Sequence, residues 1–193
     1  MRKIIVVNNV SLDGVMQAPG RADEDQRGGF AHGGWALPYN DPVMGQLMGE
    51  RMVGGGDLLL GRRTYEDFAS FWPDQQDNPF TDVLNRIQKY VASTTLIEPL
   101  PWVNSSLLAG DAADAVAELK RGEGGDIAIL GSGVLCRSLM RRGLIDEYLL
   151  SIHPLLLGSG QRLFPEGGAF AALQLVESVP TTTGVIIAIY QAA

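Results

Sequence analysis

The sequence predicts an α/β protein with a central, mostly parallel sheet flanked by helices and a C-terminal antiparallel hairpin. Short apolar runs rich in Val, Ile and Leu alternate with amphipathic stretches through most of the 193 residues, as in parallel sheets that are covered on both faces. The tail LQLVESVPTTTGVIIAIYQ contains two such runs separated by a turn, which predicts the hairpin. No repeat and no linker interrupts the pattern, so we predict a single domain over residues 1–193.

The first part of the chain is predicted to hold a buried strand followed by a long loop. KIIVVNNVSL is a continuous apolar run, as expected for a strand covered on both faces, and Asp13-Gly14 marks the turn after it. Residues 17–40 are rich in Gly, Pro and charge and show neither helical nor strand periodicity. A loop of this length is typical of a lid or a binding loop. Trp35 and Tyr39 within it either fold over a ligand or anchor the loop on the core.

The middle of the chain is predicted to alternate helices and strands. Asp41 is a good N-cap and Pro42 suits the first helical position, so DPVMGQLMGERMV begins as a helix. DLLLG is a short buried strand, Thr64 opens a helix in RRTYEDFASF, TDVLNRI is a short helix, and KYVAST is a strand. WVNSSLL is a further short strand. Asp111 then caps the clearest helix of the sequence, and Gly122 ends it.

The last third is predicted to continue this alternation. DIAILG is a buried strand, VLCRSLMRR a helix, and IDEYLLSIHPLLLG a strand that ends at His153. We expect His153 to be packed and hydrogen-bonded rather than a general acid, because no acid or serine stands at a triad-like spacing from it. Asp146 and Glu147 are adjacent in a strand and therefore face opposite sides. We expect them to pair with Arg141 or Arg142 rather than act together in catalysis.

The composition restricts the classes of function. Apolar residues make up 46% of the chain and charged residues 19%, with a net charge of −7. This acidic balance argues against a nucleic-acid partner, which would need a basic face. The single cysteine, Cys136, excludes a cysteine-cluster metal site and is expected to be a buried small residue. No leader and no apolar run of the ~18 residues that span a bilayer is present, so we expect a cytoplasmic protein without a membrane partner or a metal.

Three predicted strand ends carry residues that suit phosphate groups. LLLGRRTYE offers a glycine for close approach and two guanidinium groups, VASTTL offers two hydroxyls, and ILGSGVL offers a Gly-Ser-Gly turn that leaves backbone N–H groups free ahead of a helix. The residues concerned are Gly61, Arg62, Arg63 and Thr64; Ser93 and Thr94; and Gly131, Ser132 and Gly133. In parallel α/β sheets, ligands bind at this carboxyl edge of the strands.

The Gly-Ser-Gly turn alone is either a plain tight turn or a phosphate cradle. It does not complete the G-x-G-x-x-G fingerprint, because Cys136 stands where the third glycine would be. The argument for a ligand comes from three sites of one kind on one edge. A pyrophosphate on a helix N-terminus, together with a second phosphate held by Arg and hydroxyl side chains, is what NADPH requires.

These segments resemble a known family. SLDG, LLLGRRTYEDF, KYVAST, GGDIAILGSGVL, GLIDEYLLSIHPLLLGSGQRLF and GVIIAIY are similar, in this order and over nearly the whole chain, to the dihydrofolate reductase-like superfamily. Within it they most resemble the reductase domain of riboflavin biosynthesis, the RibD C-terminal family, in its stand-alone form. The resemblance implies an NADPH-dependent reductase with a mostly parallel sheet of eight or nine strands, and a homodimer.

The resemblance also assigns residues to the cofactor. It implies that residues 61–64, Ser93 and Thr94 hold phosphates, with Arg62 or Arg63 on the 2′-phosphate. It further implies that Gly131, Ser132, Gly133, Val134 and Leu135 hold the pyrophosphate and nicotinamide side, and that Asn9, Val10 and Ser11 lie near the nicotinamide.

Residues for the substrate and for catalysis are less clearly marked. Dihydrofolate reductases carry a carboxylate on the helix before the G-R-x-T motif, where this chain has Met44, Gly45, Leu47 and Met48, with Asp41 only at the helix start. Asp13 and Asp41 are therefore the candidate catalytic acids, although Asp13 is also explained as a turn residue. A substrate carrying a ribose phosphate would need a basic clamp, for which Arg21, Arg27 and Arg162 are candidates.

The sequence thus predicts an NADPH-dependent reductase of a small heterocyclic substrate, resembling 5-amino-6-(5-phosphoribosylamino)uracil reductase. The zinc signature of the deaminase half of the bifunctional riboflavin enzyme is absent. Two alternatives stay open. One is dihydrofolate reductase-type activity, which the missing acid disfavours; the other is a non-catalytic nucleotide-binding protein with the same fold.

Overall fold

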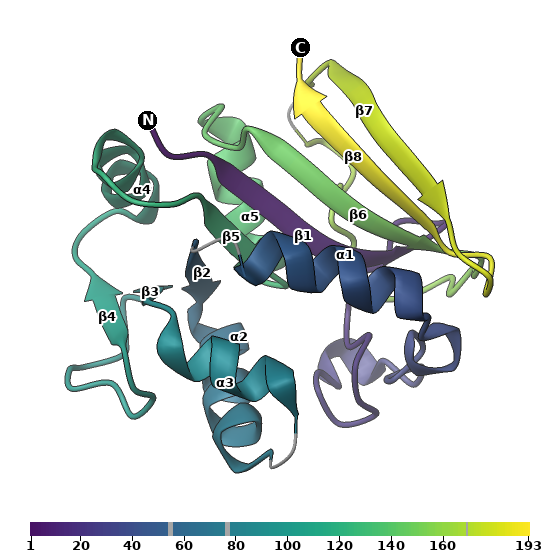
Figure 1. Cartoon of the computed structure of the whole chain (residues 1–193), viewed down its shortest axis with the longest axis horizontal. Coiled ribbons are helices and arrows are strands. Elements are labelled where there is room, and N and C mark those ends of the chain that lie inside the picture. The colour runs from purple at the N-terminus through teal and green to yellow at the C-terminus, as the bar shows by residue number, and fades with distance from the viewer. Residues whose placement is uncertain (54–55, 76–77, 169) are drawn as a thin grey trace.

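A computed structural model describes residues 1–53, 56–75, 78–168 and 170–193. The described residues form one eight-stranded sheet at the centre of the molecule (Figure 1). Its strands are β1 (Ile4–Ser11), β2 (Asp57–Gly61), β3 (Lys89–Ala92), β4 (Ser105–Leu108), β5 (Ile127–Leu130), β6 (Glu147–His153), β7 (Leu173–Pro180) and β8 (Ile186–Ala192).

The strand order is β4-β3-β2-β5-β1-β6-β8-β7. The strands from β4 to β6 are parallel, whereas β8 is antiparallel to β6 and β7 is antiparallel to β8. The predicted fold class, a mostly parallel sheet with a C-terminal antiparallel hairpin, is confirmed. β1 lies between β5 and β6, which explains its continuous apolar sequence.

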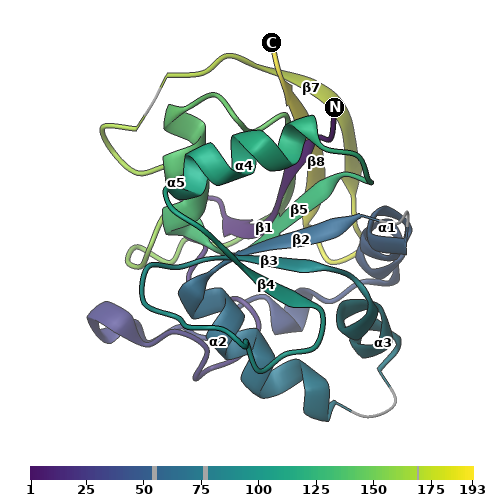
Figure 2. The ribbon, with the colours of Figure 1, turned by 90° about the vertical axis from the view of Figure 1, so that its left-hand side faces the viewer.

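Helices cover both faces of the sheet. They are α1 (Pro42–Val53), α2 (Arg62–Phe71), α3 (Pro79–Arg86), α4 (Ala112–Arg121) and α5 (Gly133–Arg141). Figure 2 shows α4 and α5 on one face and α1, α2 and α3 on the other. α1, α2, α4 and α5 each lie in a crossover between parallel strands, α3 follows α2 in the crossover from β2 to β3, and the crossover from β3 to β4 contains no helix.

The two faces are packed differently. The face under α4 and α5 holds one large apolar cluster, which includes Ile127 and Ile129 of β5. The opposite face holds two clusters, one with α2 and α3 and one with α1 and the β6–β8 side. Ala128 and Leu130 of β5 are only partly buried and pack against both clusters. β5 therefore contributes to both clusters on this face.

The long loop of residues 17–40 is anchored on the core. Phe30 and Trp35 are 7% exposed, and the indole N–H of Trp35 donates to the carbonyl of Gln17 at 2.7 Å. The loop is also tied to α2, since Arg21 forms an ion pair with Asp67. Of the two interpretations of Trp35, anchoring of the loop is the one that the structure supports. Residues 27–29 and 37–39 form short 3-10 turns within it.

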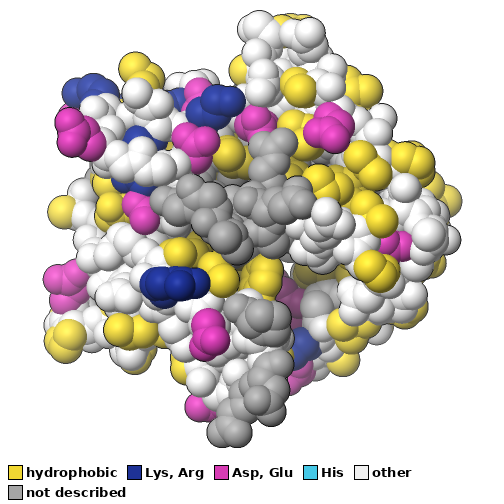
Figure 3. All heavy atoms as spheres, viewed as in Figure 1, with side chains coloured by type: hydrophobic (Ala, Val, Ile, Leu, Met, Phe, Trp, Pro, Cys, Tyr) yellow, Lys and Arg dark blue, Asp and Glu magenta, His cyan; other side chains and the backbone are white. Residues whose placement is uncertain are grey.

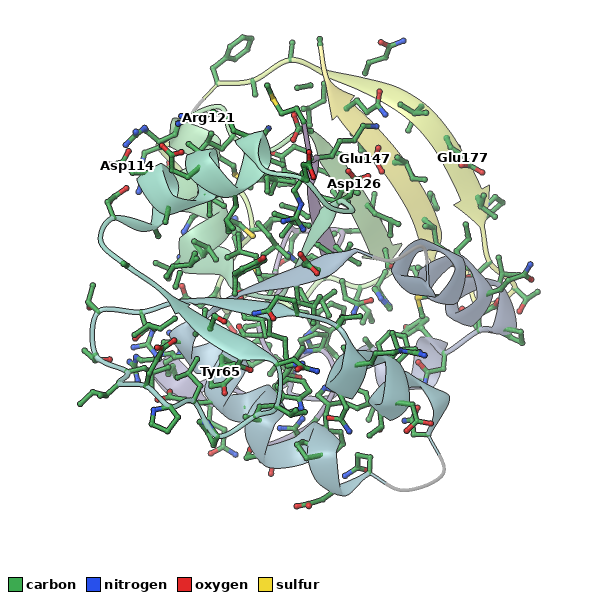
Figure 4. All side chains as sticks on the ribbon, turned by 60° about the vertical axis from the view of Figure 1, so that its left-hand side comes forward. Tyr65, Asp114, Arg121, Asp126, Glu147 and Glu177 are labelled. Carbon is green, nitrogen blue, oxygen red and sulfur yellow. The ribbon has the colours of Figure 1, made fainter. Side chains whose placement is uncertain are left out.

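The paired carboxylates at the start of β6 are structural, but their expected partners were wrong. Asp146 accepts from the ammonium of Lys120 at 2.6 Å and from a backbone N–H of β1, while Arg142 pairs with Asp114 of α4. Glu147 begins β6 and Asp126 precedes β5, so both lie at the amino edge of the sheet, with β1 between their strands (Figure 4). Gly61, at the end of β2, lies at the opposite edge. Lys120 of α4 thus takes the place expected for Arg141 or Arg142 beside Asp146, and Lys3 lies 3.7 Å from Glu147. Both carboxylates lie at the edge of the sheet opposite to the residues predicted to bind phosphates.

Candidate cofactor site

The junctions β2–α2 and β5–α5 are fastened to each other at the carboxyl edge of the sheet. The backbone N–H of Gly61 donates to the hydroxyl of Ser132 at 2.9 Å, and the backbone N–H of Ser132 donates to the hydroxyl of Thr64 at 3.1 Å. β2 and β5 are neighbouring parallel strands, so both helices start at the same edge. The two hydrogen bonds hold the starts of α2 and α5 side by side.

Both of these helix starts lack a side-chain cap. The N-cap residues are Gly61 for α2 and Ser132 for α5, and neither side chain accepts a hydrogen bond from its own helix. By contrast, Asp111 caps α4 by accepting from the N–H groups of Ala113 and Asp114. The first N–H groups of α2 and α5 have no intrahelical acceptor, and the helix dipole adds positive potential there. Two such ends together suit a pyrophosphate.

The turn before α5 has a backbone shape that brings it close to α2. Gly131 and Ser132 have φ angles of 56° and 54°, so two successive residues are left-handed. A Cβ on Gly131 would lie 3.3 Å from a methyl carbon of Thr64, and one on Gly133 would lie 2.7 Å from the sulfur of Met16. Glycine is therefore favoured at position 131 by its left-handed backbone and by the nearness of Thr64, whereas at position 133 it is favoured by space alone, because a Cβ there would displace the end of the Met16 side chain.

Two details of the predicted cradle need correction. Thr64 does not cap α2, which begins at Arg62; its hydroxyl accepts from Ser132 instead. For the same reason the N–H of Ser132 is not free for a ligand. The groups left for an anion are the N–H groups of the first helical turns, residues 62–64 and 133–135. Leu135 is only 6% exposed and packs in the core, so its backbone alone is available.

Arginine and hydroxyl side chains flank the two helix starts. Arg62 forms an exposed pair with Glu66 at 3.1 Å, which is a weak interaction that a ligand can replace. Arg63 is exposed, and within the described ranges its side chain has no ion pair or hydrogen bond. Ser93 follows β3, whose Ala92 pairs with Gly61, so it lies on the same edge. Its hydroxyl accepts from two N–H groups of the next turn, and Thr94 beside it is exposed.

The end of β1 supplies the third part of the site. The amide oxygen of Asn9 lies 3.0 Å from the Nε2 atom of His153, whereas Val10 is buried in the core on the opposite face. The sequence argument did not include Asn8, whose amide donates to the carbonyl of Gly131 at 3.2 Å. The pair of asparagines in an otherwise apolar strand was the available signal. The structure thus brings the residues predicted for the cofactor to one edge.

Asp13, the first candidate catalytic acid, is fully engaged in hydrogen bonds. Its carboxylate accepts from the hydroxyl of Ser11 at 2.6 Å and from the backbone N–H groups of Leu157 and Gly158 at 3.1 and 2.8 Å. The bond from Ser11 is the main reason why the pKa of Asp13 is lowered to about 2. This carboxylate joins the turn after β1 to the loop after β6. Its contact with a substrate stays a prediction.

Asp41, the second candidate acid, has a similar structural role. One carboxylate oxygen accepts from the N–H of Val43 at 2.8 Å, which makes Asp41 the N-cap of α1 as predicted. The other accepts from the backbone N–H and the hydroxyl of Thr182 in the β7–β8 turn. The hydroxyl bond lowers the pKa of Asp41. These contacts account for Asp41 without catalysis, and a catalytic role for it stays a prediction.

The three candidate arginines of a substrate clamp do not converge. Arg21 pairs with Asp67 of α2, and Arg27 pairs with Asp25 in its own loop. Arg162 lies 3.8 Å from Asp13, the longest of these contacts. Each guanidinium therefore has a carboxylate beside it, so a phosphate on the substrate would have to displace one of them.

Among the described residues, no group of three or more His, Cys, Asp or Glu is arranged to hold a metal ion. Within the same ranges, none of the helices combines the length and the apolar character needed to cross a membrane. Cys136 is buried, and burial raises the pKa of its thiol to about 12, so it packs as a small apolar residue as predicted.

Comparison with known proteins places these features in context. The model of the RibD C-terminal domain family matches residues 2–187. The uncharacterised protein YyaP of Bacillus subtilis is 28% identical over 198 residues, which cover 98% of this chain and 94% of that protein. Among solved structures, a putative riboflavin biosynthesis protein from Shewanella sp. PV-4 aligns with a TM-score of 0.70 at 24% identity and covers 99% of both chains. Dihydrofolate reductase from Enterococcus faecalis, in complex with NADP(H) and RAB-propyl, aligns with a TM-score of 0.62 at 16% identity and covers 98% of this chain and 96% of that one.

Proposed function

This chain belongs to the RibD C-terminal domain family, and we propose that it is an NADPH-dependent reductase of a small heterocyclic substrate. The reaction most resembles the reduction of 5-amino-6-(5-phosphoribosylamino)uracil in riboflavin biosynthesis. The proposal includes a cytoplasmic location and a homodimeric state.

The observation that carries the proposal is the pair of uncapped helix starts. The bonds between Gly61, Thr64 and Ser132 fix α2 and α5 so that the N–H groups of both first turns face one edge. A single pyrophosphate can accept from two helix ends only if they are held this close. The left-handed Gly131–Ser132 backbone allows that approach without a side chain in the way. These residues therefore fit the pyrophosphate of NADPH.

The side chains around the helix starts fit the rest of the cofactor. Arg63 is exposed without a carboxylate partner in the described ranges, Arg62 has only an exposed one, and Ser93 and Thr94 follow the neighbouring strand. Guanidinium and hydroxyl donors of this kind suit a 2′-phosphate. We propose that they select NADPH over NADH.

When bound, NADPH would supply the hydride, so the protein must align the two rings and exclude water. Asn9 is a partly exposed polar side chain near the end of β1, and it lies on the face of the sheet where Leu130 of β5 is also partly exposed. Asp13 and Asp41 are held by structural hydrogen bonds, and we propose that the final proton comes from water or from the substrate.

Binding of NADPH is the first test. At a concentration of about 100 times Kd, NADPH should raise the stability by about 2.7 kcal/mol and the melting temperature by roughly 5–10 °C. Oxidation of NADPH with the ribosylaminopyrimidine and with dihydrofolate then separates the two enzyme activities. Binding without oxidation of either substrate would favour the non-catalytic nucleotide-binding alternative, and absence of both the shift and NADPH fluorescence change would refute every version that uses this cofactor.

We propose that the homodimer forms through β7 and the adjoining part of β8. All described positions of β7 are at least partly exposed, and exposed apolar side chains gather over β7 and β8 (Figure 3). They include Leu173, Leu175, Val176 and Ile186, at 37–54% exposure. Glu177 is the single charged residue in this strand (Figure 4). In a chain of net charge −7, a surface with one acid is where a second copy can approach with least repulsion.

The substitution Leu175→Glu should convert the dimer to a monomer, because it places a charge in the centre of this surface. Light scattering coupled to gel filtration should show twice the chain mass for the wild type and a single chain mass for the variant. Val103→Glu, at another exposed apolar position, is the matched control and should stay dimeric. A monomeric wild type, or dissociation by both variants, would contradict the assignment.

A further inference from the structure

A cluster of polar side chains lies at the carboxyl end of the sheet face that α1 covers. Asn9 is on β1, and Ser151 and His153 are on β6, with Asn9 paired to Ser151 in the parallel ladder. Two residues earlier on the same strands and on the same face, the corresponding pair is Val7 and Leu149, and both are apolar. Ser151 and His153 are 0% exposed. Polar groups at such positions are costly unless they bond to something, so their presence here indicates a role.

His153 is held rigidly by two rings of the long loop. The ring of Trp35 lies edge-on to it at a centroid distance of 5.0 Å, and the ring of Tyr39 lies edge-on at 5.6 Å. The indole of Trp35 is fixed in turn, because its N–H donates to the carbonyl of Gln17, and the backbone at Tyr39 is held by the hydroxyl of Thr183, which donates to the Tyr39 carbonyl at 2.9 Å. The imidazole is therefore packed between the sheet and the anchored long loop.

This fixed imidazole sets the orientation of the Asn9 amide. The Nε2 atom of His153 lies 3.0 Å from the amide oxygen of Asn9, and its Nδ1 atom has no hydrogen-bond partner in the described ranges. An oxygen can only accept, so Nε2 carries the proton and Nδ1 does not. The NH2 group of Asn9 then points away from His153. Asn9 is partly exposed, and no described protein acceptor takes these two hydrogens.

Asn9 also lies beside the proposed cofactor site. The preceding residue, Asn8, donates to the carbonyl of Gly131 at 3.2 Å on the other side of the strand. Side chains alternate along a strand, so Asn9 faces the α1 side at the level of the Gly131 turn. An unpaired amide donor is thus presented next to the place where the reacting rings would meet.

We propose that His153 is a positioning residue that holds Asn9 as a hydrogen-bond donor toward a carbonyl oxygen of the bound ligand. The inference rests on the proposed function. The carbonyl belongs either to the carboxamide of the nicotinamide or to the substrate heterocycle, and both present the same acceptor to Asn9. His153 acts through Asn9 and does not touch the ligand. A site built in this way favours a ring with a carbonyl over one that presents a donor at the same position.

The test combines binding with a double-mutant cycle. Asn9→Ala should weaken NADPH binding about 5- to 10-fold, the value of one hydrogen bond, and should leave binding of 2′-phospho-ADP-ribose, which lacks the nicotinamide, unchanged. His153→Leu should cause a similar loss, His153→Gln should recover most of it, and His153→Leu should add nothing in the Asn9→Ala background. If the substrate supplies the carbonyl, the same pattern appears in the KM for the ribosylaminopyrimidine, with kcat nearly constant.

The outcomes separate this inference from the proposed function. If the wild-type protein does not bind NADPH, both the proposed function and this inference are refuted. A wild type that binds NADPH while Asn9→Ala changes neither NADPH affinity nor the KM by more than about two-fold overturns the inference alone, because one net hydrogen bond should exceed that. Additive losses in the double variant overturn the positioning role. Nitrogen-15 spectra of the ligand-free protein should show protonated Nε2 and unprotonated Nδ1 in His153, and the reverse tautomer would also overturn the inference.

Discussion

Replacing Arg62 and Arg63 together with alanine is expected to weaken NADPH binding about 100-fold while NADH binding changes by less than about three-fold. The 2′-phosphate is the group that distinguishes the two cofactors. A hydrogen bond between charged groups contributes about 1.5–3 kcal/mol, and two guanidinium groups would together contribute about 3 kcal/mol. The pair between Arg62 and Glu66 is exposed, so its loss should have little effect on stability.

The matched control is the double variant Arg86→Ala and Arg141→Ala. Both arginines are exposed and lie at the far ends of α3 and α5, so the variant changes the net charge equally without touching the proposed site. It should keep the affinity for NADPH within about two-fold at 0.15 M salt, where distant charges are screened. If the variant lost affinity equally for NADPH and NADH, these arginines would bind the pyrophosphate rather than the 2′-phosphate. If it lost affinity for neither cofactor, they would not be part of the site.

The fold was predictable because its signals are local. A continuous run such as that of β1 needs partners on both sides, and the helices between the strands leave few arrangements other than a parallel sheet. The hairpin of β7 and β8 was marked by its turn. The edge position of β7, and hence its exposure on both faces, is not visible in its composition, because Leu and Val in a strand fit a buried position equally well.

The sequence was sufficient to predict which strand ends form the candidate site, but not which hydrogen bonds connect them. Each strand end could be recognised separately, but the partner of a hydroxyl depends on which strands become neighbours. Thr64 has the residue type of a helix cap, yet β5 places the N–H of Ser132 within reach and takes that hydroxyl. The hydrogen-bond partners of Asp13 and Asp41 could not be predicted for the same reason. Their acceptor oxygens bond to residues 141–145 positions away in the chain, which no local pattern reveals.

His153 illustrates how far a sequence argument can reach for one residue. The absence of a triad-like spacing predicted a packed, hydrogen-bonded histidine, and the structure confirms this. The asymmetry between its two ring nitrogens arises from Asn9 on a neighbouring strand and from two rings of a distant loop. The proposed positioning role of His153 rests on this difference between its two nitrogens, and the difference depends wholly on tertiary contacts.

The same burial makes His153 a source of acid sensitivity. Burial lowers its pKa from 6.5 to about 4, and its ring contacts with Asn9, Trp35 and Tyr39 bring no carboxylate to stabilise the charged form. Between about pH 4 and 6.5 the unfolded chain therefore binds more protons than the folded one, so stability rises with pH across this window. As the pH falls from 6.5 to 4, the folded state should lose about 3 kcal/mol from this residue.

The variant His153→Gln should remove this dependence, because glutamine does not titrate. Urea unfolding at pH 7, 5.5 and 4 should show the wild type losing stability relative to the variant, with the difference between them changing by about 3 kcal/mol over the range. Asp13 and Asp41 are present in both proteins, so the loss of their contributions at lower pH cancels in the difference. A constant difference would mean that His153 has the same pKa in the folded and the unfolded protein, and hence that its burial does not disfavour the charged form.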